Sequence, residues 1–332
     1  MASPTCKQIL NTRPDPLDVL ITTAHVVEHA RFVNIDRKAI ERAADVLIEK
    51  QIAPPAWNYD LHFHDGTPRA LNYLFLLDAL NFCFWGKPKW GITYNRKKIN
   101  GYWALAAALK RAVEKNPEIL DADFLARISP QELAMILRGT VTIPLFTERW
   151  RCVRELGVTL KNLWAGEAAR FVECAQHDAP RLAQMVVENF SSFNDIAVYD
   201  SREVRFFKRA QIVVCDVWGS FDGKDWGEFD NINELTAFAD YKLPQILRAW
   251  GILKYAPILA RKVDAQTELA AGSPEEIEIR AAMLWAVEFL RDALAQRGRK
   301  LWSVHVDWIL WDASQGGFEK MQPYHRVRTI FY

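Results

Sequence analysis

Helical periodicity dominates the pattern of apolar and polar residues along the chain. It is clearest between residues 274 and 296, where the apolar residues lie mostly along one helical stripe: Ile277, Ile279, Met283, Leu284, Val287, Phe289, Leu290 and Leu294. Start signals precede the stripe, with Ser273 as N-cap, a proline at the first helical position and a glutamate three residues after the cap. Gly298 supplies the stop. The segment is predicted to be a long amphipathic helix.

Weaker patterns of the same kind predict helices throughout the chain. A second start signal, Ser129-Pro130-Gln131-Glu132, begins a short helix that ends at Gly139. Strand signals are confined to segment 90–103, which predicts one hairpin around a turn at residues 95–98. The further predicted helices span 38–50, 102–114, 148–163, 166–176, 178–189, 204–217, 232–240 and 243–260.

These elements indicate an all-α protein with one small β-hairpin. No Gly/Ser-rich linker divides the chain, so we expect one mainly helical domain over residues 16–332, preceded by a looser N-terminal tail at residues 1–15. The length of 332 residues would also allow two domains of typical size.

Charge and composition exclude several classes of protein. The 42 Lys and Arg residues nearly balance the 41 Asp and Glu residues, which argues against a protein that binds a nucleic-acid backbone. No apolar run approaches the roughly 20 residues that a membrane span needs, and the first residues lack a signal-peptide layout. The five cysteines are scattered and form no CxxC pair, so we expect reduced thiols in a cytoplasmic protein.

The common chemical motifs are absent or weak. Phosphate-binding glycine loops and the GxSxG nucleophile motif are not found. His25-Val26-Val27-Glu28-His29 fits the short HxxEH zinc-peptidase pattern, but a third ligand is missing, and two surface histidines on an amphipathic helix explain it better. We therefore expect no metal and no cofactor.

Aromatic and acidic residues supply better candidates. His62 and His64 alternate in a loop with Trp57 and Tyr59, where they could contact a polar ligand. Asp240 ends the predicted helix 232–240, where a carboxylate opposes the helix dipole.

Two further carboxylates, Asp307 and Asp312, lie in a strongly apolar stretch that suggests partial burial. A spacing of five rotates them by about 140° on a helix, so they share a pocket only if it wraps round the helix or the helix ends near Trp311. Structural ion pairs with arginines of segment 278–299 would explain them equally well.

Basic residues embedded among aromatics could bind a phosphate group. They form two groups, Lys208 with Arg209, and His325 with Arg326 and Arg328. Either group could instead simply neutralise acidic residues.

Seven blocks of sequence, in order, resemble the queuosine salvage protein family of queuosine 5′-phosphate N-glycosylases. The similarity extends from about residue 16 to the C-terminus and is looser in the N-terminal third. The blocks are NFCFW (81–85), FKRAQIVVCDVW (207–218), LTAFADYKLPQIL (235–247), GILKY (251–255), EIEIR (276–280), WILWD (308–312) and HRVRTIFY (325–332).

The resemblance implies an all-α fold akin to helical DNA glycosylases and hydrolysis of queuosine 5′-phosphate to queuine and ribose 5-phosphate. The family's base-binding residues correspond to Phe238, Asp240, Asp307 and Trp308, and its proposed nucleophile or transition-state stabiliser corresponds to Asp312. The resemblance also places a base-binding histidine at His62, although His64 remains an alternative. Candidates for the 5′-phosphate, on weaker grounds, are Lys208, Arg209, His325 and Arg326.

This inventory suits the chemistry of a 7-deazaguanine base. Its side chain carries a cationic amine that one carboxylate could pair with, while another carboxylate accepts hydrogen bonds from the guanine-like edge. A third would face the developing positive charge at C1′.

We expect a small-molecule substrate, with no direct nucleic-acid or membrane partner. Two alternatives stay open: a nucleic-acid base glycosylase and a non-catalytic queuine-binding protein. The sequence leaves open the oligomeric state, the preference for nucleotide or nucleoside, and whether a covalent intermediate forms.

Overall fold

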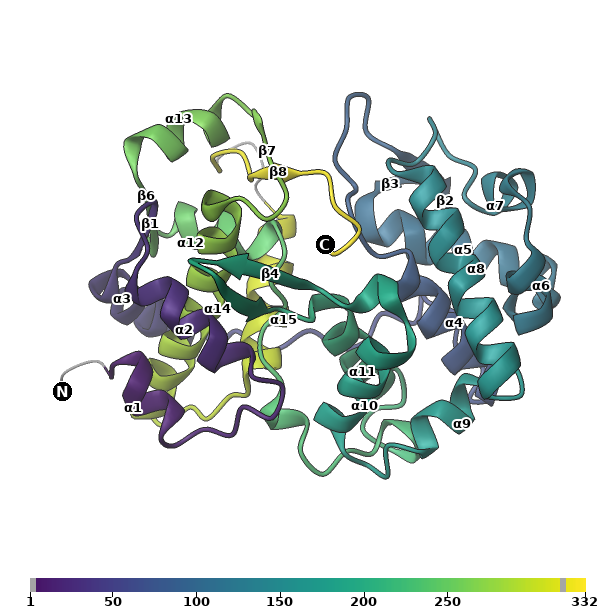
Figure 1. Ribbon diagram of the computed structural model, residues 1–332, viewed down its shortest axis with the longest axis horizontal. Coiled ribbons are helices and arrows are strands. Elements are labelled where there is room, and N and C mark those ends of the chain that lie inside the picture. The colour runs from purple at the N-terminus through teal and green to yellow at the C-terminus, as the bar shows by residue number, and fades with distance from the viewer. Residues whose placement is uncertain (1–3, 317–320) are drawn as a thin grey trace. The chain divides into compact units, whose positions relative to one another are not determined.

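The computed structural model describes residues 4–316 and 321–332, and these are mainly helical (Figure 1). The sheets within these ranges have two short strands each. This confirms the predicted all-α fold class. The expected likeness to helical DNA glycosylases stays a prediction.

Packing divides the chain into two compact units, each assembled from separated segments. Unit 1 comprises Met1–Pro55, Asp195–Lys208 and Asn231–Arg328. Unit 2 comprises Ala56–Asn194, Arg209–Asp230 and Thr329–Tyr332. The chain passes from one unit to the other several times, and the expectation of one domain from residue 16 onward stays a prediction.

Helix α14 (Pro274–Gln296) is the central element of unit 1. It starts as predicted, since the Ser273 side chain accepts a hydrogen bond from the Glu276 amide. Every residue from Glu276 to Leu290 is buried, so the helix is covered on all sides rather than along one stripe. The helices that pack against it are α2 (Val19–Glu28), α3 (Arg37–Glu49), α12 (Lys242–Ala249) and α15 (Ser303–Gln315), as Figure 1 shows.

Short elements complete unit 1. The helices are α1 (Cys6–Leu10), α13 (Pro257–Asp264) and the 3₁₀ turn η4 (Ile232–Glu234). The antiparallel strand pairs are β1 (Val33–Ile35) with β6 (Leu253–Tyr255) and β4 (Ile196–Tyr199) with β5 (Arg202–Arg205), and the parallel pair is β7 (Glu268–Leu269) with β8 (Arg326–Val327).

The predicted N-terminal tail is structured over its described part, while residues 1–3 lie outside the described residues. Thr5 and Gln8 form a capping box at the start of α1, and Cys6 and Ile9 are buried. Arg13 is buried and forms an ion pair with Glu288 of α14. The described part of this segment is therefore packed into unit 1.

Three predicted helices differ from the structure. Segment 204–217 begins in β5, and α11 (Lys208–Ser220) starts only after Phe207, whose φ of +48° is left-handed. Segment 232–240 contains only the turn η4. Segment 243–260 is divided, because Gly251 takes a left-handed φ of +73° after α12 and Pro257 starts a new helix.

Unit 2 is built round α4 (Pro68–Ala79), in which every residue from Ala70 onward is buried. The other helices of unit 2 are α5 (Gly101–Lys115), α6 (Ala122–Arg127), α7 (Pro130–Ile136), α8 (Phe146–Leu163), α9 (Ala168–Glu173), α10 (Ala179–Asn189), residues 209–220 of α11, and the 3₁₀ turns η1 (Pro117–Leu120), η2 (Ser191–Phe193) and η3 (Asp225–Gly227). Of these, α5, α8 and α9 contact α4.

Two local predictions in unit 2 are confirmed. Ser129 and Glu132 form a full capping box at the start of α7. The hairpin consists of β2 (Gly91–Tyr94) and β3 (Lys97–Asn100). Its turn is tighter than predicted, since only Asn95 and Arg96 lie between the strands, with left-handed φ values of +46° and +64°.

Candidate active site

Two buried carboxyl groups lie close together in unit 1. Asp240 is 8% exposed and ends the irregular segment 235–240, while Asp307 is 3% exposed and lies on α15. Asp307 Oδ2 accepts a hydrogen bond from the Phe238 amide at 2.8 Å. The negative charge of Asp240 also acts on Asp307. The structure thus brings together Phe238, Asp240 and Asp307, which the resemblance assigns to the base-binding site.

Asp240 lies before the start of a helix, and not at the end of one as the sequence predicts. No helix ends at Asp240; instead its Oδ1 accepts hydrogen bonds from the Lys242 and Leu243 amides, at 2.8 and 2.9 Å. These amides belong to the first turn of α12. A carboxylate there satisfies unpaired N–H groups and is favoured by the helix dipole, the reverse of the expected opposition.

Burial controls the ionisation of both acids. Burial is the main effect on Asp240 and raises its pKa. The charge of Lys208 and the hydrogen bonds from the α12 amides oppose burial and lower this pKa. Burial raises the pKa of Asp307 well above its ordinary value, and the charge of Asp240 raises it further, while the Phe238 amide and Lys208 lower it. Asp307 therefore favours the protonated form more strongly than Asp240 does.

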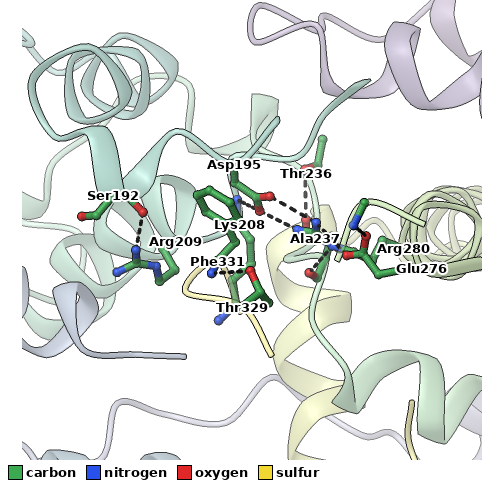
Figure 2. Close-up of polar contacts among 12 residues, drawn as sticks. Ser192, Asp195, Lys208, Arg209, Thr236, Ala237, Glu276, Arg280, Thr329 and Phe331 are labelled. Atoms are coloured by element: carbon green, nitrogen blue, oxygen red, sulfur yellow. Dashed lines mark hydrogen bonds and ion pairs between the residues drawn. The ribbon is translucent and has the colours of Figure 1, made fainter. Parts of the chain in front are cut away.

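Lys208 is the cation of this cluster. It is buried at the first position of α11, and its charge acts on both Asp240 and Asp307. Its backbone N–H donates to Asp195 Oδ2 at 3.4 Å, a contact drawn in Figure 2. Lys208 therefore balances the charge of the acidic pair.

The other two residues that the resemblance assigns to this region are also on α15. Trp308 follows Asp307 directly and is half-buried. Asp312 is exposed and lies five residues after Asp307, on a helix that continues to Gln315. Within residues 4–316 and 321–332, Asp312 makes no hydrogen bond or ion pair. The structure does not bury Asp312 with Asp240 and Asp307.

His62 belongs to unit 2, where it is buried. Its ring stacks on Trp57 at 4.3 Å, Nδ1 lies 2.7 Å from the Asn58 carbonyl oxygen, and Nε2 lies 2.9 Å from the Tyr102 hydroxyl. Burial lowers the pKa of His62 to about 4, so its imidazole is neutral at pH 7. His64 is half-buried, with Nδ1 2.9 Å from Ser220 Oγ. A role for either histidine in binding a base stays a prediction.

Hydrogen bonds within the protein or a lowered pKa argue against a phosphate role for three of the four candidates, Arg209, His325 and Arg326. Arg209, in unit 2, is buried and donates to the carbonyls of Asp78, Ala79 and Ser192, the last contact drawn in Figure 2. These contacts favour a structural role.

The other two are the basic residues near the C-terminal end of unit 1. Burial, with the nearby charge of Arg280, lowers the pKa of His325 to about 3, so His325 supplies no positive charge at pH 7. Arg326 donates to Gln266 Oε1 at 2.6 Å. Of the four, only Lys208 is shown beside the acidic pair.

The HxxEH residues form the end of α2 and its C-cap, His29, and the ring centroids of His25 and His29 are 4.2 Å apart. Among the residues that the structure describes, His, Cys, Asp and Glu side chains form no group of three or more that could hold a metal ion. Within the same residues, no helix is both long and apolar enough to cross a bilayer.

Comparisons with known proteins match nearly the whole chain. The family model described as queuosine salvage protein matches residues 61–332. A protein of Sphaerobacter thermophilus is 49% identical, over 96% of this chain and 98% of the relative. Relatives from Mus musculus and Bos taurus are 36% and 35% identical, over 96% and 92% of this chain and 99% and 96% of their own lengths. All three are named queuosine 5′-phosphate N-glycosylase/hydrolase. With this coverage and identity, the chain belongs to the queuosine salvage protein family.

Proposed function

We propose that this chain hydrolyses the N-glycosidic bond of queuosine 5′-phosphate and releases queuine and ribose 5-phosphate. The bond between C1′ and the base nitrogen breaks, and its electron pair goes to the base. Water forms the new bond to C1′, one of its protons goes to the base and the other remains on the sugar hydroxyl. The observation that carries the proposal is the buried Asp240–Asp307 pair with Lys208, in a chain whose relatives are named for this reaction.

A protonated Asp307 would assist the leaving base. Queuine has carbon in place of N7, so the usual site for protonating a purine leaving group is missing. Asp307 Oδ2 accepts the Phe238 amide, which leaves Oδ1 to carry a proton and donate it to an acceptor on the base. Phe238 and Trp308 would lie against the base, as the resemblance implies.

The remaining carboxylates would serve two different positive charges. The resemblance assigns the charge at C1′ to Asp312, but burial favours Asp240 for it. A carboxylate held by two amides in a low-dielectric site stabilises an oxocarbenium-like transition state more strongly than a solvated one does. The exposed Asp312 suits the cationic amine of the queuine side chain, which can remain partly in water.

A series of three isosteric variants tests this assignment. Release of ribose 5-phosphate from queuosine 5′-phosphate would be measured for Asp240→Asn, Asp307→Asn and Asp312→Asn. We expect Asp240→Asn to lower kcat by about 10²–10³-fold or more, the range typical of lost electrostatic stabilisation. Asp312→Asn should raise KM and change kcat only a few-fold. A large kcat loss in Asp312→Asn with an active Asp240→Asn would instead restore the assignment to Asp312.

The same assay separates the proposed reaction from its rivals. Queuine binding without release of ribose 5-phosphate by the wild-type chain would indicate a carrier. Release of base only from tRNA or DNA would indicate a nucleic-acid glycosylase, which is expected to flip its target base out of the duplex. Either result would overturn the proposal.

Lys208 is the proposed contact for the 5′-phosphate, because its charge lies at the acidic pair. Lys208→Met should lower kcat/KM for the nucleotide more than for the nucleoside queuosine. An equal loss of kcat/KM for both substrates would show that Lys208 acts only on the acids.

The five free thiols also fit a cytoplasmic location, which we propose for this chain.

A further inference from the structure

A buried guanidinium lies directly behind the Asp240 segment. Arg280 of α14 is 2% exposed and uses all its nitrogens within unit 1. Nη1 and Nη2 bind the two carboxylate oxygens of Asp195 at 3.1 and 2.5 Å, and Nη1 also lies 3.3 Å from Glu276 Oε1. Nε donates to the Ala239 carbonyl at 3.1 Å. Figure 2 shows this ion pair, which we call the Asp195–Arg280 pair.

The Ala239 contact completes the support of a three-residue segment. Phe238 is held through its amide by Asp307, Ala239 through its carbonyl by Arg280, and Asp240 through its side chain by the first turn of α12. Each residue of the segment is thus fixed by a different element. Among the hydrogen bonds of the described residues, the Arg280 contact is the only one that joins the Ala239 backbone to α14. Without Arg280, the backbone immediately before Asp240 would lose this restraint.

Asp195 extends the same support to Lys208. Its carboxylate accepts the Lys208 amide, and its backbone carbonyl accepts the Phe206 and Phe207 amides at 3.0 and 3.2 Å. The Phe206 ring lies 3.8 Å from the Arg280 guanidinium carbon. One ion pair therefore connects the backbone beside the Asp240 carboxylate to the backbone that presents the Lys208 cation.

We infer that Arg280, held by Asp195, is a positioning residue that fixes Asp240 relative to Lys208 for the chemical step. The inference rests on the proposed function. A buried ion pair by itself is weak evidence for stability, but a planar guanidinium that joins a carboxylate and a carbonyl fixes geometry in a way that a lysine ammonium cannot. Displacements of about 1 Å in a catalytic group can cost on the order of 100-fold in rate.

Arg280→Lys is the direct test, since it keeps the charge opposite Asp195 and loses the fork. We expect kcat for queuosine 5′-phosphate to fall 10- to 100-fold, on the scale of a misplaced catalytic group, with KM changed less than about threefold. Arg248→Lys is the matched control, because Arg248 makes a bidentate ion pair with Asp264 at 2.8 and 3.1 Å, near the opposite end of α12 from Asp240. The control should keep the wild-type kcat.

A double variant separates positioning from simple stability. If Arg280 acts through Asp240, Arg280→Lys should cause less than a threefold further loss of kcat when Asp240 is already Asn. A purely structural residue would cause the same loss in both backgrounds, and that result would overturn the inference.

Asp195→Asn provides a second route if Arg280→Lys does not fold at the assay temperature. It should give the same loss of kcat in protein whose thermal unfolding shows it to be folded. Wild-type kcat in either folded variant overturns the inference alone, whereas absence of ribose 5-phosphate release by the wild-type chain overturns the proposed function.

Discussion

The raised pKa of Asp307 connects the proposed chemistry of the site to the stability of the fold. Because the pKa of Asp307 is raised in the folded state, its contribution to stability is complete below the unfolded value of 3.8 and is lost as pH rises through the folded pKa. Asn cannot ionise and still offers an acceptor to the Phe238 amide. The residue that the mechanism uses as an acid is thus expected to destabilise the protein at high pH.

Asp307→Asn should therefore raise the melting temperature at pH 8, by about 1–2 °C for each kcal/mol gained in a chain of this length, and should have little effect at pH 4. Thermal unfolding at both pH values measures the difference. The exposed Asp230 provides the control substitution Asp230→Asn, which should show no such trend. The prediction would be contradicted if the difference in melting temperature between Asp307→Asn and wild type became smaller as the pH rises.

His325 should lower the stability of the fold at low pH, whereas Asp307 lowers it at high pH. Its pKa is lowered to about 3 in the folded state, so its contribution is complete above the unfolded value of 6.5 and is lost as pH falls towards 3. The loss approaches about 1.4 kcal/mol per pH unit.

His325→Gln should remove this loss. Urea unfolding at pH 7 and pH 5 should show that wild type loses about 2 kcal/mol more than the variant over this interval. Equal losses in the two proteins would mean that His325 is protonated in the folded state. The exposed His29, the C-cap of α2, gives the control His29→Gln, which should retain the wild-type pH dependence of stability.

At the scale of elements, the capping box of α7 can be tested apart from the proposed chemistry. The Ser129 side chain accepts the Glu132 amide at 3.2 Å, while Glu132 Oε2 accepts the Ser129 amide at 2.8 Å. Ser129→Ala should lower the free energy of unfolding by about 1 kcal/mol and leave kcat unchanged. Denaturant unfolding and the ribose 5-phosphate assay measure the two effects. Ser129→Thr, which keeps the hydroxyl, should recover most of the stability.

The β2–β3 hairpin offers a stabilising substitution. Both turn residues have left-handed φ values, and this turn type favours glycine at the second of them. Arg96→Gly should raise the free energy of unfolding by up to about 1 kcal/mol, because the left-handed conformation costs a non-glycine residue about that much. Lys97→Gly in the adjoining strand should lower it instead, and a stabilising effect of both substitutions would contradict the argument.

Elements with local signals could be predicted from the sequence, whereas elements defined by tertiary packing could not. The Ser273 and Ser129 caps and the hairpin follow from short-range chemistry, and the structure contains all three. Helix α4 was not predicted, because its residues show no amphipathic stripe and its cap, Thr67, is not followed three residues later by the glutamate that follows Ser129 and Ser273. The 243–260 pattern continued through Gly251, where the chain turns to form β6.

The candidate site divides in the same way. The motif that contains Phe238 and Asp240 could be found by its resemblance to a family, but the role of Asp240 as a cap depends on where α12 starts. Asp195 carried no sequence signal: it lies in a polar stretch outside the quoted blocks, and its partner Arg280 is 85 positions away. Arg280 does lie in the block EIEIR, which gave the one available indication.

At the scale of the whole molecule, an ion pair ties the start of the chain to a distant part of it. Arg13 and Glu288 are both buried, and Ser303 Oγ also donates to Glu288 at 2.6 Å. Arg13→Met would leave Glu288 buried with Arg291 as its remaining ionic partner, at 3.2 Å. We expect a loss of about 3 kcal/mol in the free energy of unfolding, near the lower limit for a broken buried pair.

The double variant Arg13→Met with Glu288→Leu should recover most of this loss, because apolar pairs can replace buried ion pairs at little cost. Urea unfolding measures both. An unchanged stability in Arg13→Met would mean that the first residues contribute little to unit 1, as the sequence suggests for a tail.

The central place of α14 in unit 1 has a consequence for synthesis of the chain. Helices α2 and α3 leave the ribosome about 250 residues before the end of the helix that covers them. At typical translation rates this interval lasts roughly 10–50 s, during which their apolar faces remain exposed to other nascent chains. Newly made chains of this protein should therefore depend on molecular chaperones more than a chain whose neighbouring helices are consecutive.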